Sequence, residues 1–179
     1  MIPFVLSRQI SVETHNYFKD LFLEIPTSAN DQIGLIKLEK DIQVRFKSGE
    51  VFFVQLENSE IAWSERLYIE LGIDTKIYPL SPQIAAIVND GIIPRHNDYS
   101  TDETVLVNVG IKDVHLTKTL FYYPNETIQI QYEPRQAFVF NPKIDHEVTW
   151  RDCNYQTTHR VSLTLKFYDK FDNFIRNLK

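Results

Sequence analysis

The sequence predicts a mainly β fold of the α+β class: a jelly-roll, cupin-like barrel with helices from the N-terminal region packed on one of its two sheets. Three observations lead to it. The chain has 179 residues, 43% of them hydrophobic, which is enough for one domain with a substantial core. Twelve Phe and nine Tyr against five Gly are typical of β-structure with large packed side chains. From about residue 83, short β-rich runs alternate with turn signals.

The N-terminal region, residues 1–80, predicts a mixture of helices and strands that supports the barrel. Ser11 is a suitable N-cap for a helix over residues 12–23, in which aromatic residues recur at helical spacing. The run QVRFKSGEVFFVQL predicts two strands joined at Ser48–Gly49. A second helix is expected over EIAWSERLYIEL, and Gly72 supplies its C-terminal stop.

Eight strands are expected between residues 83 and 168, separated by turns rich in Asn, Asp, Pro and Gly. In order, they are QIAAIV, IIPRHND, TVLVNVGI, TKTLFYY, ETIQIQY, QAFVFNP, DHEVTW and HRVSLTLKFY. Eight short antiparallel strands commonly close into a two-sheet jelly roll, a group that includes the cupin-like barrels. The N-terminal helices would then cover the outer face of the larger sheet. No repeat or linker interrupts the sequence, so we expect one domain over residues 1–179.

Composition narrows the classes of partner and compartment. The formal net charge is −5 and the isoelectric point is about 5.5, which argues against a nucleic-acid partner, because such proteins usually present a basic face. The single cysteine, Cys153, excludes an internal disulfide and a cysteine zinc cluster. The apolar run MIPFVL is too short for a signal segment or a membrane span. We therefore expect a cytoplasmic protein without a membrane segment.

His96 and Asp98 lie two positions apart in the run IIPRHND, so in a strand their side chains face the same side. Taken alone, the pair is explained as well by two polar residues at a turn after Pro94. His146 changes this, because it begins the expected seventh strand, and the second and seventh strands of an eight-stranded roll are neighbours in one sheet. Two imidazoles and one carboxylate on one face of a metal leave positions open for a co-substrate and O₂, an arrangement that suits Fe(II).

Arg160 opens the eighth expected strand, and Ser162 lies two residues on, on the same face. A guanidinium beside a hydroxyl makes a fork for a carboxylate, although an isolated arginine is usually a salt-bridged residue at the rim. His159 is adjacent to Arg160 and so faces the opposite way in a strand. We therefore expect His146, and not His159, to be the distal metal ligand.

Together, these residues resemble the iron(II)/2-oxoglutarate-dependent oxygenases. The family pattern is an HxD motif, then a distal histidine, then a basic residue that binds 2-oxoglutarate, often as RxS. Here HND at 96–98, His146 and RVS at 160–162 follow in that order on β-rich sequence. The resemblance covers about residues 83–168, and the N-terminal half carries no signature of the family.

The resemblance implies a fold, cofactors and an activity. The fold would be a double-stranded β-helix, the jelly roll of this family. His96, Asp98 and His146 would bind Fe(II), while Arg160, helped by Ser162, would bind the far carboxylate of 2-oxoglutarate. With O₂ as the other co-substrate, the enzyme would decarboxylate 2-oxoglutarate to succinate and hydroxylate a peptidyl residue, an amino acid or a small metabolite. Asp98 favours hydroxylation, because the halogenase branch has a small residue in its place.

Four further residues are candidates for contacts around the site or with the substrate. Asn108 interrupts an apolar run, where a buried amide needs a partner. Tyr122 is a candidate donor to 2-oxoglutarate. Arg95 and Tyr99 flank the metal strand at its mouth. No separate side-chain acid or base is assigned, because the chemistry would be centred on the metal.

Two alternatives remain open at this point. One is a cupin-type metal enzyme that uses the same barrel without 2-oxoglutarate, which would leave the Arg160–Ser162 fork without a purpose. The other is a non-catalytic jelly-roll module that binds a sugar or a peptide, which would have no need of three inward metal ligands.

Overall fold

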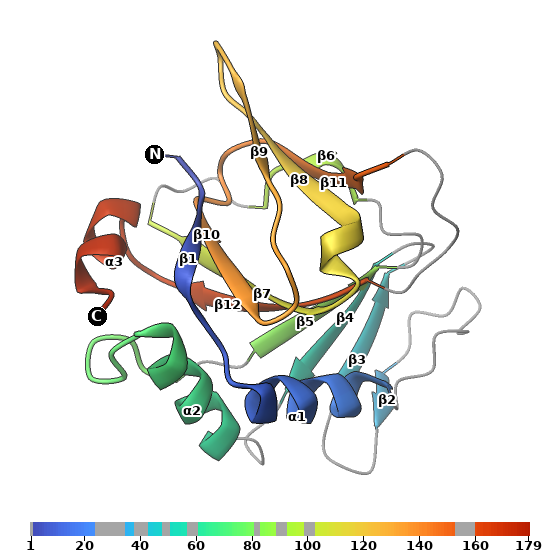
Figure 1. Cartoon of the computed structure of the whole chain (residues 1–179), viewed down its shortest axis with the longest axis vertical. Helices are drawn as coiled ribbons and strands as arrows, with labels where there is room; N and C mark the ends of the chain where they lie inside the picture. Colours follow the sequence, from blue (N-terminus) through green and yellow to red (C-terminus); the bar gives the residue numbers. More distant parts are fainter. Residues whose placement is uncertain are drawn as a thin grey trace.

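The computed structural model of the chain describes residues 2–23, 35–37, 43–47, 51–56, 61–80, 83–88, 93–98, 103–152 and 160–179. Within them, two antiparallel sheets face each other, and helices cover the outer face of the larger sheet (Figure 1). This is the mainly β, two-sheet architecture that the sequence predicts. The described part contains no helix long and apolar enough to cross a membrane.

All eight predicted barrel strands are present. They are β5 (Gln83–Val88), β6 (Ile93–His96), β7 (Val105–Lys112), β8 (Thr117–Tyr122), β9 (Thr127–Ile130), β10 (Gln136–Phe140), β11 (His146–Trp150) and β12 (Arg160–Phe167), with a short 3₁₀ helix, η3 (Val114–Leu116), before β8. The small sheet has the order β6-β11-β8-β9, and β10-β7-β12-β5 form the centre of the large sheet. The second and seventh strands of the barrel, β6 and β11, are therefore neighbours, as expected.

The remaining elements extend and cover the large sheet. They are β1 (Phe4–Gln9), α1 (Val12–Leu23), β2 (Leu35–Lys37), β3 (Gln43–Lys47), β4 (Val51–Leu56), α2 (Ile61–Leu71) and α3 (Phe171–Asn177). Strand β1 joins the sheet beside β10, and β4, β3 and β2 continue it beyond β5. The predicted hairpin is confirmed as β3 and β4, although its turn at Ser48–Gly49 lies outside the described residues. The sequence did not predict β1, β2 and α3.

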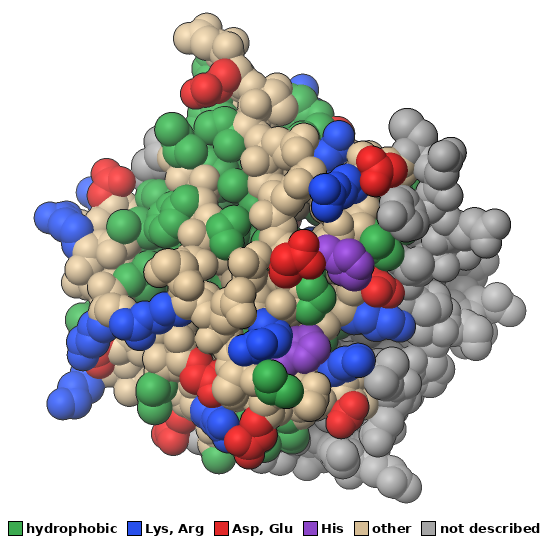
Figure 2. Space-filling model, viewed as in Figure 1, with side chains coloured by type: hydrophobic (Ala, Val, Ile, Leu, Met, Phe, Trp, Pro, Cys, Tyr) green, Lys and Arg blue, Asp and Glu red, His purple; other side chains and the backbone are tan. Residues whose placement is uncertain are grey.

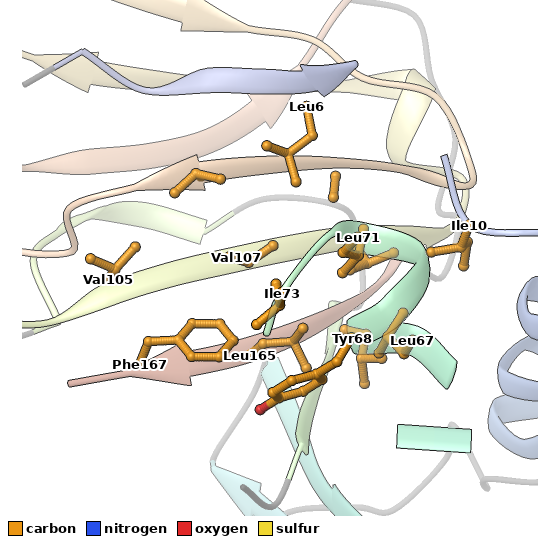
Figure 3. Packing of buried hydrophobic residues seen from close by; sticks show 14 of the residues in the cluster. Leu6, Ile10, Leu67, Tyr68, Leu71, Ile73, Val105, Val107, Leu165 and Phe167 are labelled. Carbon is orange, nitrogen blue, oxygen red and sulfur yellow. The ribbon is translucent and has the colours of Figure 1, made fainter. Parts of the chain in front are cut away.

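The two faces of the large sheet have different surroundings because side chains alternate along each strand. On β12, Val161, Leu163, Leu165 and Phe167 face the helices, where they pack with residues of α1, α2 and α3. Figure 3 shows side chains of β7 and β12 meeting those of α2 in this layer, which we call the helix-side core. The predicted cover of helices on this face is confirmed. Arg160 and Ser162, on the other face of β12, point into the space between the sheets, which we call the barrel interior.

The barrel interior contains a second hydrophobic cluster with residues from both sheets, including Leu106, Phe121, Phe138 and Phe140. On the face of the molecule in Figure 2, hydrophobic side chains gather near β1 and β10, while basic and acidic side chains are intermingled around the edges and over the lower half of the view. The barrel interior thus combines the apolar side chains of this second cluster with the polar residues Arg160 and Ser162.

The N-terminus of α1 is held by a carboxylate from α2. Ser11 is the predicted cap, since its Oγ accepts a hydrogen bond from the Thr14 backbone N–H at 3.2 Å. Glu70 accepts hydrogen bonds from the backbone N–H and hydroxyl of Ser11, at 2.9 and 2.7 Å, and from the Thr14 hydroxyl at 2.9 Å. Arg66 donates to the same carboxylate at 3.0 Å. Glu70 therefore joins the two helices that cover the large sheet.

Gly72 ends α2 as predicted. Its φ of 76° lies in the left-handed region, and the Ile73 N–H donates to the Tyr68 carbonyl oxygen at 2.8 Å, a pattern of helix C-caps. A Cβ at this position would lie 2.5 Å from the backbone oxygen of Lys179. Both the backbone conformation and the close contact require glycine here.

We expect Glu70→Gln to lower the free energy of unfolding by about 1–3 kcal/mol at pH 7, because it weakens several hydrogen bonds to a charged acceptor. Burial alone would raise the pKa of Glu70, but the hydrogen bonds from Ser11, Arg66 and Thr14 outweigh it and hold this pKa below its ordinary value. A lowered folded-state pKa gives stability that is present above the unfolded pKa and is lost as the pH falls through the folded value. The gap between wild type and variant should therefore shrink in acid.

Urea unfolding at pH 7 and below pH 4 measures both effects. Glu65→Gln, an exposed carboxylate on the same helix, is the matched control and should change stability by less than about 0.5 kcal/mol. A gap between wild type and Glu70→Gln that stays constant into the acid range would contradict this role for Glu70.

Candidate metal centre

Two histidines face each other across the β6–β11 pair. His96 is the last residue of β6, His146 is the first of β11, and the two are direct cross-strand partners. Asp98 follows just beyond β6. Its Oδ1 lies 3.3 Å from His96 Nε2, and its Oδ2 lies 3.5 Å from His146 Nε2. The three potential ligand atoms lie within 4.8 Å of one another, so the structure brings together all three residues proposed from the sequence.

Both imidazoles are oriented by their own backbone. His96 Nδ1 lies 2.7 Å from the Pro94 carbonyl oxygen, and His146 Nδ1 lies 2.8 Å from the Ile144 carbonyl oxygen. We assign the proton to Nδ1 in each ring because each faces an acceptor. The Nε2 lone pairs are then directed at Asp98 and at the space between the three residues. This arrangement of the second ring nitrogen is typical of histidines that bind metals.

The two histidines have different surroundings. His146 is 5% exposed, and the rings of Phe121 and Phe140 lie 5.5 and 5.2 Å from its ring. Burial lowers the pKa of His146, which favours the neutral, metal-binding form. Asp98 raises the pKa of the more exposed His96, because a protonated His96 ring would donate a hydrogen bond from Nε2 to this carboxylate. Two imidazole nitrogens and a carboxylate on one side of an open space form a donor set that fits a divalent transition metal.

A second polar cluster lies deeper in the barrel interior, around Arg160. The side chain is 1% exposed. Its Nε donates to Thr117 Oγ1 at 3.0 Å, one terminal nitrogen donates to the Tyr132 hydroxyl at 2.8 Å, and the other lies 3.4 Å from Ser162 Oγ. The contact with Thr117 crosses from the large sheet to the small one, so Arg160 lies between the sheets.

The partners of Arg160 among the described residues are all neutral. Burial raises the pKa of Tyr132 and outweighs the opposing effect of Arg160, so this hydroxyl keeps its proton. Among the described residues, no carboxylate pairs with Arg160. A buried guanidinium without a counter-ion is costly, which is why buried charges are usually paired. The cluster therefore has the chemistry of a binding site for an anion.

Asn108 also faces the barrel interior. It lies opposite Thr164 in the β7–β12 pair, and its Oδ1 accepts a hydrogen bond from the Thr164 hydroxyl at 2.8 Å. Thr164 lies on the same face of β12 as Arg160 and Ser162. The interior face of the large sheet therefore carries a polar strip beside the apolar cluster.

Arg95 and Tyr122, the other described candidates, lie together on the outer side of the small sheet. The guanidinium of Arg95 stacks over the Tyr122 ring at 4.1 Å and donates to Asp145. The tyrosine beside Arg160 is Tyr132 and not Tyr122. Tyr99, His159 and Cys153 lie outside the described residues.

Sequence reasoning missed Thr117 and Tyr132. Thr117 had a usable signal, because it shares a face with Thr119 and Phe121 in a strand that alternates between buried and half-buried residues. Tyr132 also had a signal, because it ends the predicted strand ETIQIQY at a spacing of two from Ile128 and Ile130, and all three lie in the interior cluster.

The comparisons with known proteins agree with this architecture. No family model matches the sequence, and no curated protein matches it significantly. Solved structures do match. A prolyl hydroxylase from Trichoplax adhaerens, in complex with a hypoxia inducible factor oxygen degradation domain peptide, is 12% identical with a TM-score of 0.58, and the match covers 97% of this chain and 86% of that one.

Two further structures match over nearly the same length. An oxidoreductase of the 2OG-Fe(II) oxygenase family from Burkholderia pseudomallei is 15% identical with a TM-score of 0.54, over 93% of this chain and 85% of that one. SnoN, a non-heme alpha-ketoglutarate-dependent epimerase from nogalamycin biosynthesis, is 8% identical with a TM-score of 0.54, over 93% and 78%. At these identities the likeness concerns the fold. The chain has the double-stranded β-helix fold of the 2-oxoglutarate and iron(II)-dependent oxygenases.

Proposed function

We propose that the protein is an iron(II)/2-oxoglutarate-dependent oxygenase. The observation that carries the proposal is the pairing of two sites in one barrel. His96, Asp98 and His146 form a metal-binding donor set at the end of β6, and Arg160 lies buried in the same interior without a carboxylate partner among the described residues. A fold alone supports many activities, so the argument depends on these side chains.

The triad would hold Fe(II) through His96 Nε2, His146 Nε2 and a carboxylate oxygen of Asp98. When bound, the metal would supply the activation of O₂ that is coupled to the decarboxylation of 2-oxoglutarate to succinate and CO₂. The protein's own contribution is to fix the donors. The Pro94 and Ile144 carbonyls hold the two rings, while Phe121 and Phe140 shield His146 from water.

Arg160 would bind the far carboxylate of 2-oxoglutarate. A dianionic co-substrate supplies the negative charge that the buried guanidinium lacks. Ser162 and Tyr132 both touch the guanidinium and carry hydroxyls that can donate to the same carboxylate. Thr117 holds the Nε side of the group. This cluster favours the oxygenase over a cupin-type metal enzyme, which would not need it, and the triad disfavours a non-catalytic binding module.

Hydroxylation is the reaction that we propose, because Asp98 completes the carboxylate-containing triad. One of the similar structures is an epimerase and not a hydroxylase, so the fold does not determine the reaction. The candidate substrates are the classes that the sequence leaves open: a peptidyl residue, an amino acid or a small metabolite.

A cleft of about 590 Å³ suggests the route by which the substrate approaches. It is lined by residues at the start of β7 and the end of β12, including Thr104, Lys166 and Tyr168. Lys166 lies opposite Leu106, Leu106 lies opposite Phe140, and Phe140 contacts the His146 ring. The cleft is therefore at the triad end of the barrel. Charged side chains at this cleft, with Glu103 and Lys170 as further members, supply groups that can bind a polar substrate.

Addition of Fe(II) and 2-oxoglutarate without oxygen tests the proposal directly. We expect a weak visible charge-transfer absorption for the wild type and slow release of succinate once air is admitted. His96→Ala and Asp98→Ala should abolish both while the protein keeps its fold, because these residues serve the metal and not the hydrophobic core. Circular dichroism checks the fold. A folded wild type without the absorption, or triad variants with full succinate release, would contradict the proposal.

Arg160→Lys should lower the affinity for 2-oxoglutarate far more than the affinity for the metal. It loses a bidentate, charge-assisted contact of about 2–4 kcal/mol, which corresponds to roughly 30-fold or more in affinity. Calorimetric titration of 2-oxoglutarate into the Mn(II)-loaded protein measures this loss. Titration of Mn(II) alone measures the affinity for the metal.

Tyr132→Phe removes one hydroxyl from the same cluster and should lower the affinity for 2-oxoglutarate by a smaller factor. Arg176→Ala, on the exposed side of α3, is the control and should change neither affinity. If Arg160→Lys binds 2-oxoglutarate as tightly as the wild type, the assigned role of Arg160 is wrong.

A further inference from the structure

The five residues between β10 and β11, Asn141–Asp145, form a turn that reaches all three members of the triad. The Asp98 backbone N–H donates to the Pro142 carbonyl oxygen at 3.0 Å. The Ile144 carbonyl oxygen accepts from His146 Nδ1 at 2.8 Å. The Asp145 carbonyl oxygen accepts from the Tyr122 N–H at 2.8 Å, which attaches the turn to β8. Two of the ligands are thus held by backbone oxygens of this turn.

The Asp145 carboxylate extends this arrangement to the third ligand, His96. Its Oδ2 accepts from Arg95 Nε at 3.2 Å and from a terminal nitrogen of Arg95 at 3.0 Å, and its Oδ1 accepts from Asn97 Nδ2 at 3.0 Å. Arg95 and Asn97 are the two residues on either side of His96, while Asp145 immediately precedes His146. One carboxylate therefore connects both neighbours of one histidine to the neighbour of the other.

Strand β6 needs such a connection. In the part of the chain that the structure describes, it lies at the edge of the small sheet and has β11 as its single neighbour. Its register with β11 shifts between His146 and Val148, so the ladder is irregular next to the site. A short edge strand with an irregular ladder is free to shift relative to its neighbour. A shift of this kind would separate the two Nε2 atoms.

We propose that Asp145 is a positioning residue of the metal centre, which holds His96 and Asp98 of the β6 segment in register with His146 and so raises metal affinity without touching the metal. The stacking of Arg95 on Tyr122 anchors the same contact to β8. The inference rests on the proposed function, in which the triad binds a divalent metal.

Ordinary surface electrostatics do not explain this role. The Asp145 side chain is 40% exposed, and an ion pair at such a site contributes little to global stability. Removal of a nearby negative charge would also weaken the attraction for any cation, and this effect has to be separated from positioning. Glu147 allows the separation, because it lies on the other side of His146, one residue away, and hydrogen-bonds to Tyr122 instead of bridging to β6.

The experiment measures Mn(II) affinity of the full-length protein, as free Mn(II) in an electron paramagnetic resonance titration. Asp145→Ala should weaken binding by about 10–100-fold, the range usual for residues that orient metal ligands. Asp145→Asn keeps one acceptor oxygen in the same place and should recover part of that loss. Glu147→Ala removes the same charge and should change affinity by less than about threefold, because charge at the surface is screened.

Two variants in the β6 segment, one on the strand and one just after it, approach the contact from the other side. Arg95→Ala and Asn97→Ala each remove one of the hydrogen-bonding partners of the Asp145 carboxylate. Each should therefore lower the affinity for Mn(II) by less than Asp145→Ala does. In the Asp145→Ala background neither should add its full effect, which is the mark of a shared interaction. These variants also carry the test if Asp145→Ala does not fold. The urea midpoints of the metal-free proteins report any loss of global stability, which the positioning role does not require.

The outcomes are distinguishable. If the wild type binds Mn(II) and Asp145→Ala binds it within about threefold as tightly, the inference is wrong and the proposed function stands. The inference is equally wrong if Glu147→Ala loses as much affinity as Asp145→Ala, since charge alone would then explain the effect. A wild type that binds no Mn(II) would contradict the proposed function itself.

Discussion

The site depends on one backbone interaction, the antiparallel pairing of β6 with β11. This pairing places His96 opposite His146, residues from distant parts of the chain, and brings Asp98 to the space between their Nε2 atoms. The jelly-roll connectivity is what makes the two strands neighbours in the small sheet. The hydrogen bonds of each Nδ1 to a carbonyl two residues earlier then fix the rings, so the proposed donor set is assembled without a bound metal.

The two faces of the large sheet carry different kinds of side chain. On β7 and β12, one set of alternating residues packs against the helices, and this helix-side core contains the largest group of buried hydrophobic residues. The other set includes Arg160 and Ser162, and the burial of the Arg160 guanidinium among neutral partners is unfavourable. The N-terminal elements thus have a physical role, since the apolar contacts that they cover offset the cost of a polar interior. Glu70 holds two of the covering helices together.

Much of this arrangement was readable from the sequence, and the exceptions have physical causes. Period-two alternation between turn signals located all eight barrel strands, and the order of jelly-roll strands put His146 beside His96. Strand β1 was missed because its pairing with β10 joins residues that are far apart in the sequence, and no local pattern encodes that. Tyr132 shares the interior face with Ile128 and Ile130, but its contact with Arg160 joins distant parts of the chain, and strand spacing does not reveal such a contact. The placement of Arg95 depends on Asp145, a contact that sequence spacing does not reveal.

Anomalous X-ray diffraction from a crystal grown without oxygen, in the presence of Mn(II) and 2-oxoglutarate, tests the central claim most directly. The account predicts one strong anomalous peak between His96 Nε2, His146 Nε2 and the Asp98 carboxylate. It also predicts electron density for 2-oxoglutarate that extends from this peak to the Arg160 guanidinium. Metal bound elsewhere, or 2-oxoglutarate with neither carboxylate at Arg160, would contradict the account and leave the double-stranded β-helix fold without the proposed chemistry.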